Sequence, residues 1–462
     1  MERPLGAKMQ HRRMRKIAFL WISVMLLTGC VTLPRGYGDA ELESSIRERL
    51  KDDFKIPVEE TRVEAIQVTI DTLVTLDEAV GIALSNNPSI RAFYAELSIA
   101  KAEAVGATLP DNPVLRGEFL ATSGNAGEKT TIAVNQNVVD LLLMPLKKRV
   151  AKGRIDQRRL YIAHKILDAV VEVKTSYLGY QRDLQILELH RSVVATAEAE
   201  AELSKRQFGE GNINALDLAR HQDVLHDAKL ELIRAEAEVR HSKELVRRLL
   251  SFDTDGDWTV EKDFPGLPSR VWTAEELLVL GHGLRLDLAA AEKRVEVLKS
   301  EVPLARFNAV IDVEAGIGRE EESDQLGTTG PEIGIALPLF DRGQADASRL
   351  RFEIVQAENQ VEAIFRDIER EILTTHSQLQ TERESTEYYR QVILPMKRSV
   401  LEAAQAHYNF MLIGVYDLLQ AKKDQISAQQ RHIETLAEYW IKYAELERTV
   451  GGALPVDNAT QH

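Results

Sequence analysis

The chain has 462 residues and a formal net charge of −14, with 72 acidic residues against 58 basic ones. This balance argues against nucleic acid and anionic lipid surfaces as general partners, because both are negatively charged themselves. Aromatic residues make up only 6% of the chain, and its many Ala, Leu, Glu, Gln and Arg residues favour long helices.

The first thirty residues have the pattern of a bacterial lipoprotein signal. Basic residues within 3–16 precede an apolar run at 17–27, which is too short for an ordinary membrane-spanning helix. The run ends in Leu-Thr-Gly-Cys, which resembles a lipobox, and Cys30 is the only cysteine of the chain. We therefore expect 1–29 to be removed as a signal peptide and Cys30 to carry acyl chains such as palmitate. In lipoproteins that carry this motif, Asp directly after the cysteine tends to retain the protein at the inner membrane. The resemblance therefore implies sorting to the outer membrane, because Val31 follows Cys30 here. The alternative to a lipoprotein signal is a plain signal peptide with a chance cysteine.

Long stretches without proline predict two helical hairpins. The intervals 146–264 and 339–454 contain one proline between them, Pro395. Segment 146–207 reads as a nearly continuous helix and is far longer than a globular helix, so it requires coiled-coil packing. One apolar stripe at helical spacing comprises Leu225, Ala228, Leu232, Ala235 and Val239.

The two halves of the chain repeat each other. Stretches 208–217 and 408–417 align at an offset of 200, and 75–90 aligns with 273–288 at about 198. Gly and Asn residues in the first of these stretches suit a tight turn. We therefore expect one hairpin in each half, with tips at about 208–217 and 408–417. The alternative is that two amphipathic hairpins look alike through composition alone.

Each half also contains a pair of short alternating segments, at about 113–139 and 309–340. In the first of them Leu115 and Arg116 begin an apolar–polar alternation. Such alternation is typical of transmembrane β-strands, although a half-buried soluble hairpin looks the same. Four strands cannot enclose a lumen, and open strand edges cannot face lipid. We therefore expect further copies of the chain to complete a barrel.

Taken together, these features resemble the outer-membrane efflux channels of the TolC family over about 74–451. The resemblance rests on LDEAVGIALSNNPSI, on PLFDRGQ at 338–344, on ILP at 393–395, on the two tips and on the closing YWIKYAELERTVGG. It implies a mainly α fold with a small β part. Long antiparallel helical hairpins would form a periplasmic α-barrel, and four transmembrane β-strands per protomer would complete a trimeric β-barrel.

The resemblance also implies a function and partners. The chain would be the outer-membrane channel of a tripartite efflux system, exporting solutes from the periplasm or the pump to the outside of a Gram-negative cell. The implied partners are two further copies, a periplasmic adaptor (membrane fusion) protein and an inner-membrane pump of the proton-driven resistance-nodulation-division type. Stretch 107–119 is similar to members paired with heavy-metal pumps, so metal cations are a candidate cargo beside drugs. The runner-up is a lipid-anchored coiled-coil scaffold without a pore.

The family's tip motif gives the candidate site residues. Asp417 matches the first of two family aspartates that narrow the channel entrance, and the second falls on Gln420. Asp217 is the equivalent in the first repeat. We expect these three to be pore or gate residues, and helix N-capping is the alternative for Asp417. The expected adaptor-contacting residues are Gly209, Gly211, Asn212, Met411, Ile413 and Gly414.

The remaining sequence patterns do not predict a catalytic or metal-binding site. The DTDGD stretch at 253–257 lacks the later residues of a calcium loop, so we interpret it as an acidic loop, and REEESD at 319–324 as an external loop. No catalytic constellation or metal-ligand spacing stands out, so we expect no enzyme, no metal site and no cofactor beyond the lipid. The expected organisation is a signal peptide 1–29, a lipidated segment 30–73, a first repeat 74–251, a linker 252–272, a second repeat 273–451 and a tail 452–462.

Overall fold

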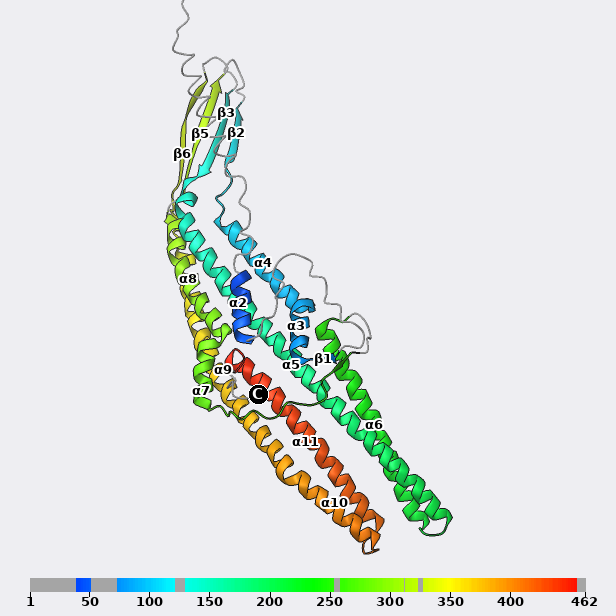
Figure 1. The fold of residues 1–462 in the computed structure, drawn as a ribbon. Coiled ribbons are helices and arrows are strands. Elements are labelled where there is room, and N and C mark those ends of the chain that lie inside the picture. Colours follow the sequence, from blue (N-terminus) through cyan, green and yellow to red (C-terminus); the bar gives the residue numbers. More distant parts are fainter. Residues whose placement is uncertain are drawn as a thin grey trace, which may run out of the picture.

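The computed structural model of the protein describes residues 39–50, 73–120, 129–252, 258–310, 312–322 and 327–454. The molecule is elongated, with four strands at one end and the turns of two helical hairpins at the other (Figure 1). It is mainly helical with a small β part, as the sequence predicts. The expected signal peptide, Cys30 and the acidic loop at 253–257 lie outside the described residues.

The described residues of the first half form five helices and three strands. They are α2 (Asp39–Leu50), β1 (Leu73–Val74), α3 (Leu76–Asn86), α4 (Pro88–Thr108), β2 (Val114–Leu120), β3 (Lys129–Asn137), α5 (Val138–Gly209) and α6 (Ala215–Leu250).

The second half follows the same order without a counterpart of α2. It comprises β4 (Thr259–Val260), α7 (Ala274–Leu284), α8 (Leu286–Val310), β5 (Asp312–Glu322), β6 (Thr328–Ala336), α9 (Gln344–Tyr388), the π-helical turn η1 (Tyr389–Ile393), α10 (Leu394–Asn409) and α11 (Val415–Val450).

Helix α5 is longer than the predicted segment 146–207. It starts at Val138, because the Asn137 side chain accepts hydrogen bonds from the N–H groups of Val139 and Asp140. Pro145 lies inside the helix and removes one backbone donor without ending it. Among the described helices, none is both long and apolar enough to cross a membrane.

Matching corners join the short and long helices in the two halves. Thr75 and Thr273 both form capping boxes at the start of α3 and α7. At the next corner, the side chain of Asn87 donates to the carbonyl of Leu249 at 2.9 Å. Its counterpart Arg285 donates to the carbonyl of Thr449 at 3.2 Å, and also to Asp287 at 2.6 Å and to Glu371 at 2.9 Å. Each corner is thus hydrogen-bonded to the C-terminal end of the second hairpin helix of its own half, α6 or α11.

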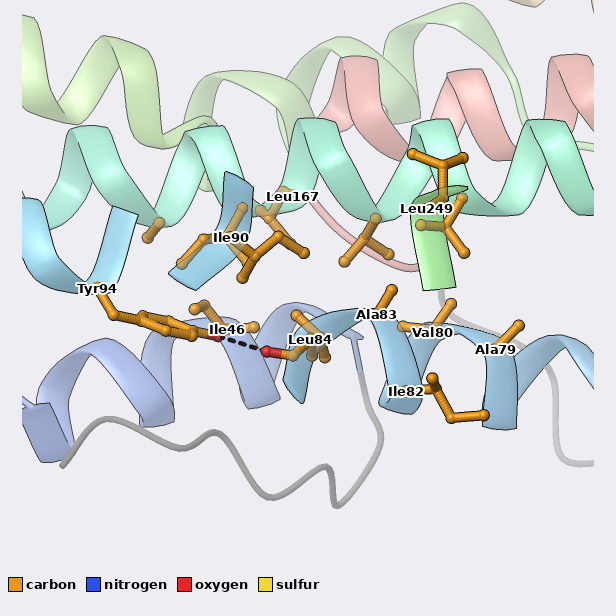
Figure 2. Close-up of a cluster of buried hydrophobic side chains, with 14 of the residues drawn as sticks. Ile46, Ala79, Val80, Ile82, Ala83, Leu84, Ile90, Tyr94, Leu167 and Leu249 are labelled. Atoms are coloured by element: carbon orange, nitrogen blue, oxygen red, sulfur yellow. Dashed lines mark hydrogen bonds between the residues drawn. The ribbon is translucent and has the colours of Figure 1, made fainter. Parts of the chain in front are cut away.

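A buried apolar cluster holds the middle of the first half together (Figure 2). Ile46 of α2, Leu84 of α3 and Ile90 of α4 are fully buried. They belong to the same cluster as Leu167 of α5 and Leu249 of α6. Full burial of each such side chain contributes about 1.5–3 kcal/mol, so this cluster fixes the short helices onto the long hairpin.

A smaller cluster does the same in the second half. Its buried members include Leu277 of α7, Ile368 and Ile372 of α9 and Leu446 of α11. Gly281 allows this packing, since a Cβ there would lie 2.4 Å from the Ile372 side chain. The short helices α2, α3 and α7, which carry part of these clusters, lie midway along the molecule, and both hairpin turns project beyond them (Figure 1).

Strands β2, β3, β5 and β6 form one antiparallel sheet in that order, and β1 pairs with β4 in a separate two-stranded parallel sheet. The two predicted strand pairs therefore join within one chain, through β3 and β5. The expected external loop at 319–324 is wrong for 319–322, which belong to β5. Arg319 pairs with Ile132 and Glu322 with Lys129, so ladder hydrogen bonds hold these charged residues in the strand.

Candidate functional site

Over most of its length the sheet has one apolar and one polar face, and the apolar face is the more exposed. Arg319 and Glu321 lie on the apolar side at the end of the sheet where β5 ends. The register of the sheet places Leu115, Val134 and Ile317 in one row across three strands, and these side chains are 43–70% exposed. Ile333 and Ile335 of β6 continue the same exposed face. An antiparallel sheet in water normally packs its apolar face on a core, so this sheet has the reverse arrangement.

The polar face is the crowded one. Asn135 is only 6% exposed, and with its amide oriented to suit its neighbours it donates to Glu332 at 3.2 Å. A Cβ at Gly316 would lie 2.4 Å from the backbone carbonyl oxygen of Val134 and would also clash with the Asn135 amide, so only glycine fits there. Shielding of this kind is expected on the inner side of a curved sheet.

Charged side chains also bridge strands on the polar face. Arg116 of β2 reaches across β3 to Glu314 of β5 at 3.8 Å. Lys129 and Glu320 form a second bridge at 2.7 Å. In the described chain the two outer strands, β2 and β6, pair on one side only. The sheet therefore has mainly polar side chains on one face, mainly apolar side chains on the other and two unpaired edge strands.

The two hairpin turns share one geometry. The N–H groups of Asn212 and Leu412 each donate to the carbonyl five residues earlier, at 2.8 and 2.9 Å. This is the closing bond of a Schellman motif, in which the preceding residue takes a left-handed backbone. Gly211 has a φ of 75° there, and Met411 has a φ of 58°. The predicted tips are thus real turns with the same backbone path.

The predicted tip residues lie at the free ends of the hairpins. Asp217 and Ile413 are half-buried, and the other predicted tip and gate residues are exposed, namely Gly209, Gly211, Asn212, Met411, Gly414, Asp417 and Gln420.

Neither tip aspartate caps its helix. Asn214 is the N-cap of α6, and its side chain accepts a hydrogen bond from the Asp217 N–H at 2.9 Å. Gly414 holds the N-cap position of α11, so the capping alternative for Asp417 is wrong. Asp417 lies in the first turn instead, where the helix dipole stabilises a negative charge.

A contact between the two tips involves the first aspartate. The Asp217 carboxylate lies 3.7 Å from the Arg220 guanidinium. That guanidinium lies 5.5 Å from the ring centre of Tyr416, on the other hairpin. A cation–π contact at this distance is worth about 0.5–1 kcal/mol at an exposed site, so it is a weak connection between the hairpins.

Gln420 is engaged with its own helix and the neighbouring one. Its amide donates to Asp424 at 2.7 Å, and Lys397 of α10 donates to the other carboxylate oxygen at 2.8 Å. Hydrogen bonds from Lys397 and then Gln420 lower the pKa of the Asp424 carboxyl. Sequence reasoning missed this cluster, because Lys397 and Asp424 are far apart along the chain and meet only through hairpin pairing.

Within the described ranges, no group of three or more His, Cys, Asp or Glu side chains is arranged to hold a metal ion. His221 is buried on α6, and burial lowers the pKa of its imidazole.

Comparison with known proteins gives consistent matches. The sequence profile of the outer membrane efflux protein family matches residues 282–452. The toluene efflux pump outer membrane protein TtgF of Pseudomonas putida is 21% identical over 313 residues, which is 64% of this chain and 62% of that protein. The chain therefore matches less than two thirds of the length of this curated relative.

Solved structures show the same fold. The outer membrane channel CmeC of Campylobacter jejuni superposes with a TM-score of 0.70 at 14% identity, covering 86% of this chain and 92% of that one. The structure of CusC also gives a TM-score of 0.70, at 15% identity, covering 87% of this chain and 99% of that one. The predicted resemblance to TolC-like outer-membrane efflux proteins is confirmed.

Proposed function

Starting from this match to the outer membrane efflux protein family, we propose that the chain is the outer-membrane channel of a tripartite efflux system. Three copies assemble side by side, and their sheets close into one β-barrel. The long helices of the three copies form a hollow α-barrel that extends into the periplasm. Solutes leave the cell through the common lumen.

The observation that carries the proposal is the arrangement of the sheet. Its exposed face is apolar from Leu115 through Ile317 to Ile335, which suits contact with lipid. Its shielded face holds Asn135 and Glu332, which suits a water-filled lumen. The free edges of β2 and β6 require partners in a membrane, and copies of the same chain supply them by closing the ring.

The remaining parts take their places from this orientation. The hairpin turns lie at the opposite end from the sheet (Figure 1), where they meet a periplasmic adaptor protein. The adaptor connects the duct to an inner-membrane pump of the proton-driven resistance-nodulation-division type. An acylated Cys30 adds a lipid anchor at the outer membrane. Asp417, Asp217 and Gln420 surround the periplasmic entrance.

The cargo is set mainly by the pump. The similarity of 107–119 to partners of heavy-metal pumps supports metal cations. The name of the relative TtgF, a toluene efflux protein, supports small organic molecules. A duct with a polar lumen accepts either class of solute.

Planar-bilayer recordings of the purified protein test the proposal with two substitutions in β3. Val134→Asp places a carboxylate between Leu115 and Ile317 on the exposed apolar face, and Thr131→Asp places the same group on the polar face of the same strand. We expect Val134→Asp to abolish insertion and conductance, because each ring of three copies would carry three charges into lipid. Thr131→Asp should still conduct. A folded wild-type trimer that never conducts, with or without its partners, would overturn the proposed function.

A further inference from the structure

The end of α5 next to the sheet is strongly basic in an otherwise acidic chain (Figure 1). Residues 147–159 contain seven basic residues and one acidic residue, whereas the whole chain has a net charge of −14. Four of the seven are paired with a carboxylate of the same chain, as Lys147–Asp140, Arg154–Glu301, Arg158–Glu96 and Arg159–Asp156. Among the described residues, the side chains of the other three have no ion-pair or hydrogen-bond partner, namely Lys148, Arg149 and Lys152.

These three unpaired cations share one exposed face of α5 with two leucines. Leu141 and Leu142 are 47% and 74% exposed. Lys148 and Arg149 follow them by seven residues each, which is two helical turns, and Lys152 lies one turn further on. The exposed face therefore changes from apolar to basic over about 10 Å along the helix.

The leucines continue the apolar face of the sheet beyond its strands. Helix α5 begins directly after β3. At the other strand–helix junction, after β6, Leu337, Leu339 and Phe340 are exposed as well, and Phe340 is 93% exposed. Basic residues just beyond an apolar band are typical of a membrane interface, where their alkyl stems lie along lipid and their charges reach the headgroups.

We propose that Lys148, Arg149 and Lys152 bind the phosphate groups of anionic phospholipids in the periplasmic leaflet of the outer membrane. The inference rests on the proposed function, because it requires the sheet to lie in that membrane. Charge complementarity selects this occupant: the three cations are unpaired, and a headgroup phosphate supplies the missing negative charge. Since the chain as a whole is acidic, lipid contact at this one level fixes how deep the sheet lies in the membrane.

Neighbouring copies of the chain leave this face of α5 open. Helix α5 packs between α4 and α8, and α9 packs on the far side of α8. The strands with unpaired edges are β2 and β6, which join α4 and α9 respectively. Copies that pair through those strands therefore lie next to α4 and α9. A water-filled lumen is the other surrounding to consider, and the exposed Leu141 and Leu142 at the start of the face disfavour it.

Native mass spectrometry of the full-length protein in neutral detergent tests the proposal. Phosphatidylglycerol and phosphatidylcholine with identical acyl chains are the two probes. We expect the wild type to bind phosphatidylglycerol about tenfold more tightly, and the triple variant Lys148→Gln, Arg149→Gln, Lys152→Gln to lower this preference to within about twofold. The melting temperature of the variant should stay unchanged, because the three side chains have no partners to lose among the described residues.

A second triple variant controls for net charge. Arg191→Gln, Arg206→Gln and Arg234→Gln remove the same number of charges from exposed ion pairs along the first hairpin, so the lipid preference should stay as in the wild type. An equal loss in both triple variants would mean that overall charge acts, and would overturn the proposal. Displacement of the lipid by millimolar inorganic phosphate would also overturn it, since the site would then be a simple anion site.

Conductance separates this proposal from the channel function. A wild-type protein that conducts in planar bilayers but does not prefer phosphatidylglycerol would overturn the lipid site and leave the channel standing. If the Lys148, Arg149 and Lys152 triple variant shifts the reversal potential in a salt gradient and keeps the lipid preference, the three residues face the lumen and the proposal is wrong. A folded wild-type trimer that never conducts would remove the channel function and this inference with it.

Discussion

The two halves of the chain have the same backbone plan but hold it with different chemistry. Along the first hairpin, Val194, Ala197 and Ala228 are buried, and Leu225 and Leu232 pack against them. At the matching positions of the second hairpin, 200 residues later, Lys397 replaces Ala197 and His432 replaces Leu232. The contact between the two helices of a hairpin, here called its seam, is therefore apolar in the first hairpin. The seam of the second hairpin is more polar, since it keeps a buried Ala428 but has Lys397 and His432.

The helix path differs as well. Helix α5 runs without interruption from Val138 to Gly209. In the second hairpin, the π-helical turn η1 and Pro395 separate α9 from α10, and α10 has no buried residue. π-turns and prolines weaken the regular hydrogen bonding of a helix. We infer that the second hairpin opens at a lower free energy than the first.

This difference shows that two helical hairpins with the same backbone arrangement can differ in local stability. An exposed ion pair such as Lys397–Asp424 contributes about 0–1 kcal/mol. The buried Val194 side chain of the first hairpin contributes more than that, about 1.5–3 kcal/mol. After a duplication, the first hairpin can thus stay rigid while the second opens more easily.

The largest expected effect lies at the two corners, Asn87 and Arg285. Arg285→Ala should lower the free energy of unfolding by about 3–5 kcal/mol, because Glu371 and Asp287 lose a buried partner. Asn87→Ala removes the side-chain partner of the Leu249 carbonyl and the N-cap bond to the Ser89 N–H, and it should cost about 1–3 kcal/mol. Chemical denaturation measures both. If both variants lose the same free energy of unfolding, the ion pairs of Arg285 add nothing to the single polar contact that Asn87 makes with its hairpin helix.

The next effect compares the two seams directly. Val194→Ala removes buried apolar surface from the first hairpin and should cost about 2 kcal/mol. Lys397→Ala removes only a partly exposed ion pair from the second, so it should cost less than about 1 kcal/mol. Amide hydrogen exchange should also be faster in 394–430 than in 194–230 of the wild-type protein. The reverse order of exchange rates would contradict the softer second hairpin.

Acid should weaken the second hairpin through His432. Burial, and then the nearby Arg390, lowers the pKa of this imidazole below its ordinary value near 6.5. The unfolded chain therefore takes up the proton first, and stability is lost as the pH falls through 6.5 toward the folded-state pKa. The substitution His432→Leu removes this imidazole and introduces the residue type that the first hairpin has at the matching position, Leu232.

In this variant, hydrogen exchange of the second hairpin should be slower and should depend less on pH below 6.5, with an effect smaller than that of Val194→Ala. Some acid sensitivity of the first hairpin should remain, because burial also lowers the pKa of His190 on α5. If the variant keeps the full wild-type pH dependence in the second hairpin, His432 is not its source.

The smallest effect concerns the two tip aspartates. Asp217 already faces Arg220, whereas Asp417 is exposed in the first turn of α11. Asp417→Asn should therefore reduce the cation preference of the channel by up to about twofold, and Asp217→Asn by less, since salt screens exposed charges. Reversal potentials in a salt gradient measure this. Identical potentials for Asp417→Asn and wild type would remove Asp417 from the entrance.

The sequence revealed those parts of the fold that depend on local pattern. Apolar periodicity and the absence of proline located the long helices, and alternation located the strands to within a few residues. The repeated turn sequences located both tips. These features follow from side-chain period and turn chemistry, which neighbouring residues alone determine.

What the sequence did not reveal depends on contacts between distant segments. Residues 319–322 carry charge and do not look like a strand, yet pairing with β3 makes them one. The contacts of Arg285 with Glu371 and of Lys397 with Asp424 arise only when helices pair. The left-handed backbone of Met411 became visible only from its φ angle, although its alignment with Gly211 was a usable signal.

The closure of the sheets into a ring is tested most directly by a cryo-electron microscopy map of the purified protein in lipid nanodiscs. We predict three copies whose β2 strands each pair with β6 of the next copy, with Leu115 and Ile335 facing lipid and Glu332 facing the lumen. A single copy whose sheet edges remain free, or an assembly in which the apolar face packs against protein away from the lipid, would contradict this account.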